Sequence, residues 1–128
     1  MKTVVICIRN LLFAQGIELA LRATGDFRPY RVTPAQPGNA VPVCMAHGAQ
    51  ILLLEVTPQE GFALPDCLNA AREIRGALPQ IKTAFLCDEV AHPELARSVM
   101  RCRQDGQIDM FFYASIPMHY LADMLDTL

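Results

Sequence analysis

The sequence predicts a doubly wound α/β domain, with five parallel strands in the order 2-1-3-4-5 and helices on both faces. Five short apolar segments alternate with five helical patterns along the chain, which has 128 residues. Hydrophobic residues make up 52% of it and charged residues 19%, as in a well-cored globular protein. Parallel strands need right-handed crossovers, so helices cover both faces of the sheet. We expect a single domain over residues 1–128.

The first half of the chain contains two expected strands and two expected helices. The β-branched run at 4–8 predicts a buried strand, and the pattern at 11–23 predicts a helix. A second, short strand is expected at 30–32. Three prolines and a glycine between residues 34 and 42 leave room only for a short helix at 43–47. The buried stripe of the first helix is expected to hold Leu12, Gly16, Leu19 and Ala23.

The second half is more regular. The segment ILLLEV at 51–56 predicts the third strand, and an amphipathic helix follows at 66–78, where Pro79 ends it. The apolar side of that helix is expected to hold Leu68, Ala71, Ile74 and Leu78. The remaining elements are expected at 83–87 (strand), 93–103 (helix), 109–114 (strand) and 117–128 (helix). The apolar side of the last helix is expected to hold Tyr120, Leu121, Met124 and Leu128.

Glu55 is a charged residue that closes an otherwise apolar strand. In open α/β sheets, ligands bind in a crevice beyond the carboxyl ends of the strands, at the point where the strand order reverses. Glu55 therefore stands where a site would be. The residues expected to line this crevice are Ile8, Arg9, Asn10, Glu55, Cys87 and Ala114.

The crevice does not carry the motifs of common catalytic chemistries. The turn after the first strand reads IRNLLFAQG, which is not a glycine-rich phosphate loop. Magnesium needs two or three converging carboxylates, whereas Glu55 stands alone and Asp88 and Glu89 are expected in an exposed turn. No Ser-His-Asp set is recognisable, and His47, His92 and His119 share no spacing. We expect no catalytic residue, no metal site and no cofactor.

Composition limits the partners of this segment. Its formal net charge of -2 provides no electrostatic surface for nucleic acid or for an anionic membrane. No apolar span reaches membrane length, and the five cysteines are an odd number without a C-x-x-C pair. We interpret the cysteines as core residues of a cytoplasmic protein. They are Cys7, Cys44, Cys67, Cys87 and Cys102.

Several landmarks together resemble one family. The start VVICIRNLLFAQGIELAL resembles the first strand and helix of response-regulator receiver domains (CheY-like), most closely those of NarL/LuxR-type regulators. In that family an acidic pair precedes His-Pro-Leu-Phe. Here Asn10-Leu11-Leu12-Phe13 and Gly16-Ile17 keep the frame, while Ile8 and Arg9 occupy the acidic positions. The resemblance covers essentially the whole chain and implies a flavodoxin-like, three-layer fold.

The later landmarks fall on the positions where receivers carry their phosphorylation chemistry. Within ILLLEV, Glu55 stands at the position of the phosphoacceptor aspartate, and Cys87 replaces the hydroxyl residue that ends the fourth strand. Phe111 stands at the aromatic switch position, and Ala114 replaces the conserved lysine of the family. Pro58 appears one place earlier than the usual proline. The resemblance thus implies a receiver frame whose acceptor site is degenerate.

The expected function is that of an atypical, phosphorylation-independent receiver that signals through protein contacts in transcription regulation. A DNA-binding domain would follow in a longer natural chain. We expect a homodimer, with interface candidates Tyr120, Met124, Leu125 and Leu128, of which Leu125 and Leu128 are the likelier exposed residues. The residues Leu11, Leu12 and Phe13 offer a second apolar surface.

Two further hypotheses concern the crevice itself. The Arg9 guanidinium is expected to pair with Glu55 where magnesium lies in an active receiver. The alternative function is a small flavodoxin-like ligand sensor or enzyme that uses the crevice around Glu55 and Cys87, and it predicts a deep apolar pocket at the strand ends.

Overall fold

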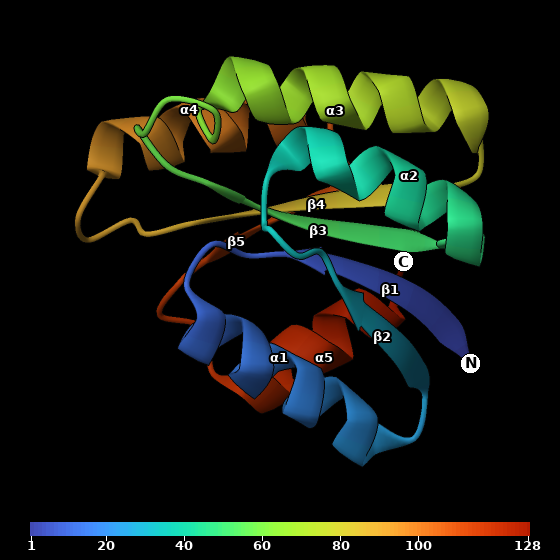
Figure 1. Cartoon of the computed structure of the whole chain (residues 1–128). Coiled ribbons are helices and arrows are strands. Elements are labelled where there is room, and N and C mark those ends of the chain that lie inside the picture. Colours follow the sequence, from blue (N-terminus) through green and yellow to red (C-terminus); the bar gives the residue numbers. More distant parts are fainter.

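The computed structural model describes all 128 residues and confirms the predicted class, with the strand order β2-β1-β3-β4-β5 in one parallel sheet (Figure 1). The strands are β1 (Lys2–Cys7), β2 (Phe27–Arg31), β3 (Ile51–Val56), β4 (Lys82–Cys87) and β5 (Met110–Tyr113). The helices are α1 (Leu11–Thr24), α2 (Pro37–His47), α3 (Leu64–Ala77), α4 (Pro93–Gln104) and α5 (Met118–Asp126).

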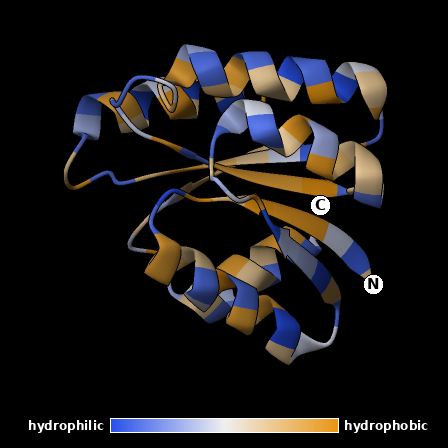
Figure 2. Ribbon diagram, viewed as in Figure 1, coloured by the Kyte–Doolittle hydropathy of each residue, from blue (hydrophilic) through white to orange (hydrophobic).

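Two hydrophobic cores lie on opposite faces of the sheet. α1 and α5 cover one face, and α2, α3 and α4 cover the other (Figure 1). Strand residues alternate between the two cores, so Val4 and Ile6 face α1 and α5 while Val5 and Cys7 face the other layer. In Figure 2 β3 and most of β1 are coloured as hydrophobic, whereas the edge strand β2 and the outer sides of the helices carry hydrophilic residues. The sheet is therefore buried on both faces.

None of the helices combines the length and the apolar composition needed to cross a membrane. The longest, α1 and α3, have 14 residues each.

The expected buried stripe of α1 is wrong. Ala14, Ile17 and Leu21 face the sheet, whereas Leu12 is 80% exposed and Leu19 is 69% exposed. Both stripes have helical spacing, so periodicity alone does not choose between them. The Asn10 side chain caps the helix by accepting a hydrogen bond from the Phe13 amide at 3.0 Å, which fixes where α1 begins. The packed helix leaves the Leu12 and Leu19 side chains in solvent.

The second helix is longer than expected, and the second strand begins earlier. α2 starts at Pro37. Proline is favourable in the first turn of a helix, because the N–H that it lacks would have no acceptor within the helix there. Pro42 lies inside the helix and is exposed. β2 starts at Phe27 because it pairs with β1 from Lys2 onward. Pro29 is tolerated there because β2 is an edge strand.

The expectation that Leu125 is exposed is also wrong. Leu125 is fully buried together with Leu121 and Ala122, so these three form the core side of α5. Tyr120, which we expected on that side, is 52% exposed. Leu128 is half-buried and packs against the same core.

Thr83 is the one buried residue with a polar side chain, and its hydrogen bonds join three elements at the amino end of β4. The Arg75 side chain donates through Nη2 to Thr83 Oγ1 and to the Gln107 carbonyl, at 3.0 Å each. Asp109 Oδ2 accepts from the Thr83 amide at 2.8 Å and from its hydroxyl at 3.4 Å. This network ties α3 to the loop before β5, at the end of the sheet opposite Glu55.

Replacing this hydroxyl tests the network. Thr83→Val keeps the side-chain volume but leaves Arg75 and Asp109 each without one partner, so it should lower the free energy of unfolding by about 1 to 3 kcal/mol. The measurement is urea denaturation followed by circular dichroism. Thr3→Val is the matched control, because Thr3 is half-buried in β1 and its hydroxyl makes no hydrogen bond. An equal loss in both variants would contradict a role for the Thr83 hydroxyl.

Candidate functional site

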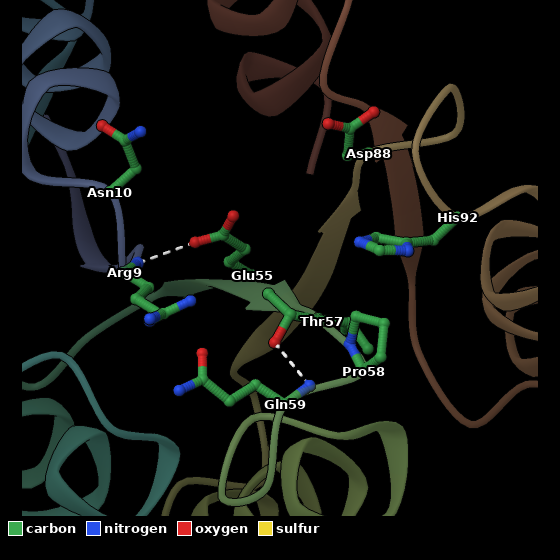
Figure 3. A pocket seen from close by; sticks show the side chains of 9 residues that line it. Arg9, Asn10, Glu55, Thr57, Pro58, Gln59, Asp88 and His92 are labelled. Carbon is green, nitrogen blue, oxygen red and sulfur yellow. Dashed lines mark hydrogen bonds between the residues drawn. The ribbon is translucent and has the colours of Figure 1, made fainter.

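A crevice of about 660 Å³ lies beyond the carboxyl ends of β1, β3 and β4 (Figure 3). Arg9 and Asn10 enter it after β1, and Glu55 enters it from β3. The loop after β3 contributes Thr57, Pro58 and Gln59, and the loop after β4 contributes Asp88 and His92. Val56 is the one hydrophobic residue among those that line it. The ligand-sensor alternative predicts a deep apolar pocket at the strand ends. That prediction is wrong for this crevice, because its lining is polar.

The structure brings together three of the six residues expected in the crevice. Arg9, Asn10 and Glu55 line it, whereas Ile8 is 3% exposed and Cys87 is 1% exposed, so both belong to the core. Ala114 lies beyond the end of β5 and is not part of the lining. Glu55 shares its strand face with Leu53 and stands where that face opens to solvent.

Asp88 and His92 line the crevice, where we did not expect them. Asp88 is exposed, as predicted for the turn after the fourth strand. Asp88 follows β4 directly, and its Oδ1 accepts from the amides of Val90 at 3.1 Å and Ala91 at 3.0 Å. The Asp88 carbonyl accepts from the His92 amide at 2.9 Å. These bonds fold the loop so that both side chains reach the crevice. The sequence contains one indication of this position for Asp88. Asp88 comes immediately after β4, and β4 pairs with β3, which carries Glu55 near its carboxyl end.

Glu55 is held by a backbone donor. Its Oε1 accepts a hydrogen bond from the Arg9 amide at 2.7 Å, and the side chain is half-buried. The bond connects the ends of β1 and β3 across the crevice floor. It fixes the position of the carboxylate without neutralising its charge.

The expected ion pair between the Arg9 guanidinium and Glu55 is absent. No carboxylate oxygen lies within 4.0 Å of that guanidinium. Its Cζ instead lies 5.8 Å from the centre of the Phe62 ring, and the side chain points away from the Glu55 carboxylate, toward Gln59 (Figure 3). Residue 9 thus contacts Glu55 through its main chain.

All five cysteines are free and buried. Burial, followed by the charge of neighbouring groups including Glu55, raises the pKa of the Cys7 and Cys67 thiols to about 12. Burial and then Asp88, Glu89 and Glu55 raise the pKa of Cys87 to about 11. These thiols stay protonated near neutral pH, which makes them poor nucleophiles and poor metal ligands.

The end of β5 differs from the expected strand. Cys87 pairs in register with Tyr113, and the Ala114 amide donates to the Cys87 carbonyl at 2.9 Å. Tyr113, rather than Ala114, is therefore the lateral neighbour of Cys87. Phe111 is half-buried and makes an edge contact with Tyr113, with ring centres 5.7 Å apart. β5 ends at residue 113, so the strand end that we predicted at residue 114 is one residue too late.

A second, mostly apolar groove of about 390 Å³ lies between β5 and α5. Two of the four interface candidates, Tyr120 and Met124, line it, whereas Leu125 and Leu128 do not. Ser115 also lines this groove, and its hydroxyl donates a hydrogen bond to Glu89, the residue next to Asp88. This hydrogen bond connects the groove to the loop that carries Asp88.

The contact between Arg9 and Glu55 generates a prediction about stability. Arg9→Ala keeps the backbone donor and should change the free energy of unfolding by less than about 0.5 kcal/mol. Glu55→Ala removes the acceptor and should cost about 1 kcal/mol, whereas Glu55→Gln keeps an acceptor oxygen and should cost less. Urea denaturation measures all three. A larger loss in Arg9→Ala than in Glu55→Ala would mean that the guanidinium holds Glu55 in solution.

No family model matches the sequence, and no curated protein matches it. Solved structures do match over almost the whole chain. A LuxR family DNA-binding response regulator from Silicibacter pomeroyi has a TM-score of 0.73 at 15% identity, over 98% of this chain and 89% of that chain. A response regulator receiver domain protein from Clostridium thermocellum has a TM-score of 0.74 at 9% identity, over 99% and 93%.

A CheY-like protein from Pseudomonas aeruginosa matches with a TM-score of 0.72 at 11% identity, over 99% of this chain and 98% of that chain. At such identities the likeness concerns the backbone. The strand order, the placement of the five helices and these three matches agree. The chain has the fold of response-regulator receiver (CheY-like) domains.

Proposed function

We propose that this chain is a receiver-type signalling domain that works through protein contacts, without phosphorylation and without enzymatic activity, in the regulation of transcription. The observation that carries the proposal is the set of groups around Glu55. No three side chains of His, Cys, Asp or Glu lie close enough together to hold a metal ion. Phosphoryl transfer depends on metal ions and cations that neutralise the charge of the transferred group.

The end of β1 explains why the donor set is poor. Ile8 is buried in the core and Arg9 brings a positive charge, so neither supplies the carboxylate that a magnesium ion requires. The side chain next to Glu55 on β4 is Leu86, which is also buried. Glu55 is thus the one acidic side chain on β1 and β3 at this edge.

Glu55 also supports a state of the domain that does not depend on a kinase. Its side chain is one methylene longer than that of aspartate, so its charge lies farther from the strand, nearer to where an aspartyl phosphate would carry charge. The Arg9 amide fixes that charge at 2.7 Å. In this proposal no kinase is needed to place negative charge in the crevice.

The role in transcription is supported by the kind of protein that shares the fold. The match from Silicibacter pomeroyi is described as a LuxR family DNA-binding response regulator. This chain has a net charge of -2, which is unfavourable for direct contact with DNA. In this proposal DNA binding is the task of another domain, and regulation is the task of this one.

The phosphorylation claim is tested with a small phosphodonor. The purified protein is incubated with magnesium and acetyl phosphate, or with magnesium and beryllofluoride, and followed by intact mass and sedimentation velocity. We expect no phosphoryl adduct and no change in sedimentation, because the crevice lacks the groups that bind magnesium.

Glu55→Asp is the informative variant in that experiment. It restores the usual acceptor but leaves Ile8 and Arg9 in place, so it should also remain unmodified. An adduct on Glu55 of the natural sequence, or a magnesium-dependent change in its assembly, would overturn the proposal. An adduct in Glu55→Asp alone would show that the acceptor, and not the rest of the crevice, is what prevents phosphorylation.

The partner surface proposed for this domain is the groove between β5 and α5, occupied by a second copy of the chain. Tyr120 is 52% exposed and Tyr113 is 41% exposed, and Ile116 and Met124 complete an apolar surface there. Exposed aromatic residues of this kind are enriched in protein interfaces. Tyr120 is the candidate anchor because it combines a large apolar area with a hydroxyl at its tip.

Sedimentation equilibrium tests this dimer. Tyr120→Asp places a charge in the groove and should raise the dimer dissociation constant by about tenfold or more, as expected for the loss of a central aromatic contact. Met45→Asp is the matched control, because Met45 is 54% exposed on α2, in the other helix layer. A monomer at all concentrations, or an equal effect of both variants, would contradict the proposed surface.

A further inference from the structure

We propose that the crevice at the ends of β1, β3 and β4 binds a small organic zwitterion, with its ammonium group against Glu55 and Asp88 and its carboxylate against Arg9. This inference rests on the proposed function, because it names a signal that would take the place of phosphorylation. It is carried by charged groups that face the crevice and have no partner of opposite charge within the protein.

The two carboxylates are oriented and yet remain available. Glu55 Oε1 accepts from the Arg9 amide at 2.7 Å, and Asp88 Oδ1 accepts from the amides of Val90 and Ala91 at 3.1 and 3.0 Å. The second oxygen of each carboxylate has no hydrogen bond within the chain, and neither group takes part in a salt bridge. Backbone donors thus fix two negative groups whose free oxygens suit an ammonium donor.

The positive group of the crevice is also unpaired. The Arg9 guanidinium has no carboxylate within 4.0 Å and lies against the Phe62 ring, with Cζ 5.8 Å from its centre. Figure 3 shows it between Glu55 and Gln59, on the side of the crevice away from Asp88. A planar guanidinium presents paired N–H donors that match a carboxylate. The guanidinium and the two carboxylates thus line one cavity without forming an ion pair with one another.

Charge and size select the class of ligand. The crevice is lined by two carboxylates and one guanidinium, so the carboxylates outnumber the guanidinium and a simple anion is disfavoured. A simple cation leaves Arg9 unpaired, and a metal ion lacks a set of three ligands. The volume of about 660 Å³ lies within the range of small-molecule sites. A zwitterion of amino-acid type satisfies both signs at once.

The experiment compares zwitterions with ligands that carry only one of the two charges. The full chain is titrated with 4-aminobutyrate and 6-aminohexanoate by isothermal titration calorimetry, and in parallel with butylamine and butyrate. We expect saturable binding of at least one zwitterion, with a dissociation constant about tenfold or more below those of butylamine and butyrate. The two chain lengths probe the separation between Arg9 and the carboxylates.

Variants place the binding in the crevice. Glu55→Gln keeps the bond to the Arg9 amide but removes the negative charge, and Arg9→Gln removes the positive charge. Each should weaken zwitterion binding by about tenfold. Glu73→Gln on α3 and Arg28→Gln on β2 are matched controls, because both residues are exposed and outside the crevice, and they should leave binding unchanged.

Three results would overturn the inference: no saturable binding of either zwitterion, equal binding of butylamine, or binding that survives both Glu55→Gln and Arg9→Gln. These failures are distinguishable from failure of the proposed function. If the protein binds no zwitterion and also takes no phosphoryl group, only the inference about the ligand fails and the proposed function stands. A phosphoryl adduct on Glu55 removes the phosphorylation-independent function, whatever the titrations give.

Discussion

Burial of β3 on both faces is the constraint on which the rest of the structure depends. Ile51, Leu52, Leu53 and Leu54 are each at most 1% exposed, because helices cover both sides of the sheet and β1 and β4 flank the strand. Polar groups inside such a strand would lose water without gaining partners. The first position that tolerates a charge is therefore the carboxyl end, where Glu55 stands. The same rule places Arg9 after β1 and Asp88 after β4.

Main-chain donors, rather than opposite charges, organise the polar crevice. The Arg9 amide holds Glu55, and the amides of Val90 and Ala91 hold Asp88. A side-chain ion pair would consume both charges and would require two flexible side chains to be ordered. Bonds from the backbone restrict each carboxylate while leaving its charge and one oxygen unused. The crevice is thus structured before any partner arrives, which reduces the entropy lost on binding.

The sequence predicts the fold well because the signals that define it are strong. ILLLEV has the bounds of β3, and the alternation of apolar strands with helices leaves few topologies open. It does not predict which face of α1 is buried. Leu12 and Leu19 lie on one apolar stripe of helical spacing, and Ile17 and Leu21 lie on another. Ala114 was misplaced because apolar residues continue past the end of β5.

The candidate site is only partly predictable for a different reason. Position after a strand locates Glu55, Arg9 and Asn10, but the direction of the Arg9 side chain depends on Phe62, which comes from a loop with no regular pattern. His92 reaches the crevice because Asp88 folds the loop before α4, and such local turns are weakly encoded. These contacts are tertiary and follow from packing.

The five buried thiols have a consequence for the chain when it is not folded. In the native state they are enclosed and protonated, so oxidants and alkylating reagents reach them only when a segment opens. All five, including Cys102, belong to the single core beneath α2, α3 and α4. Opening of that layer exposes several thiols at once and permits incorrect disulfides to form. Thiol accessibility is therefore a built-in reporter of how intact this half of the molecule is, and refolding requires a reducing solution.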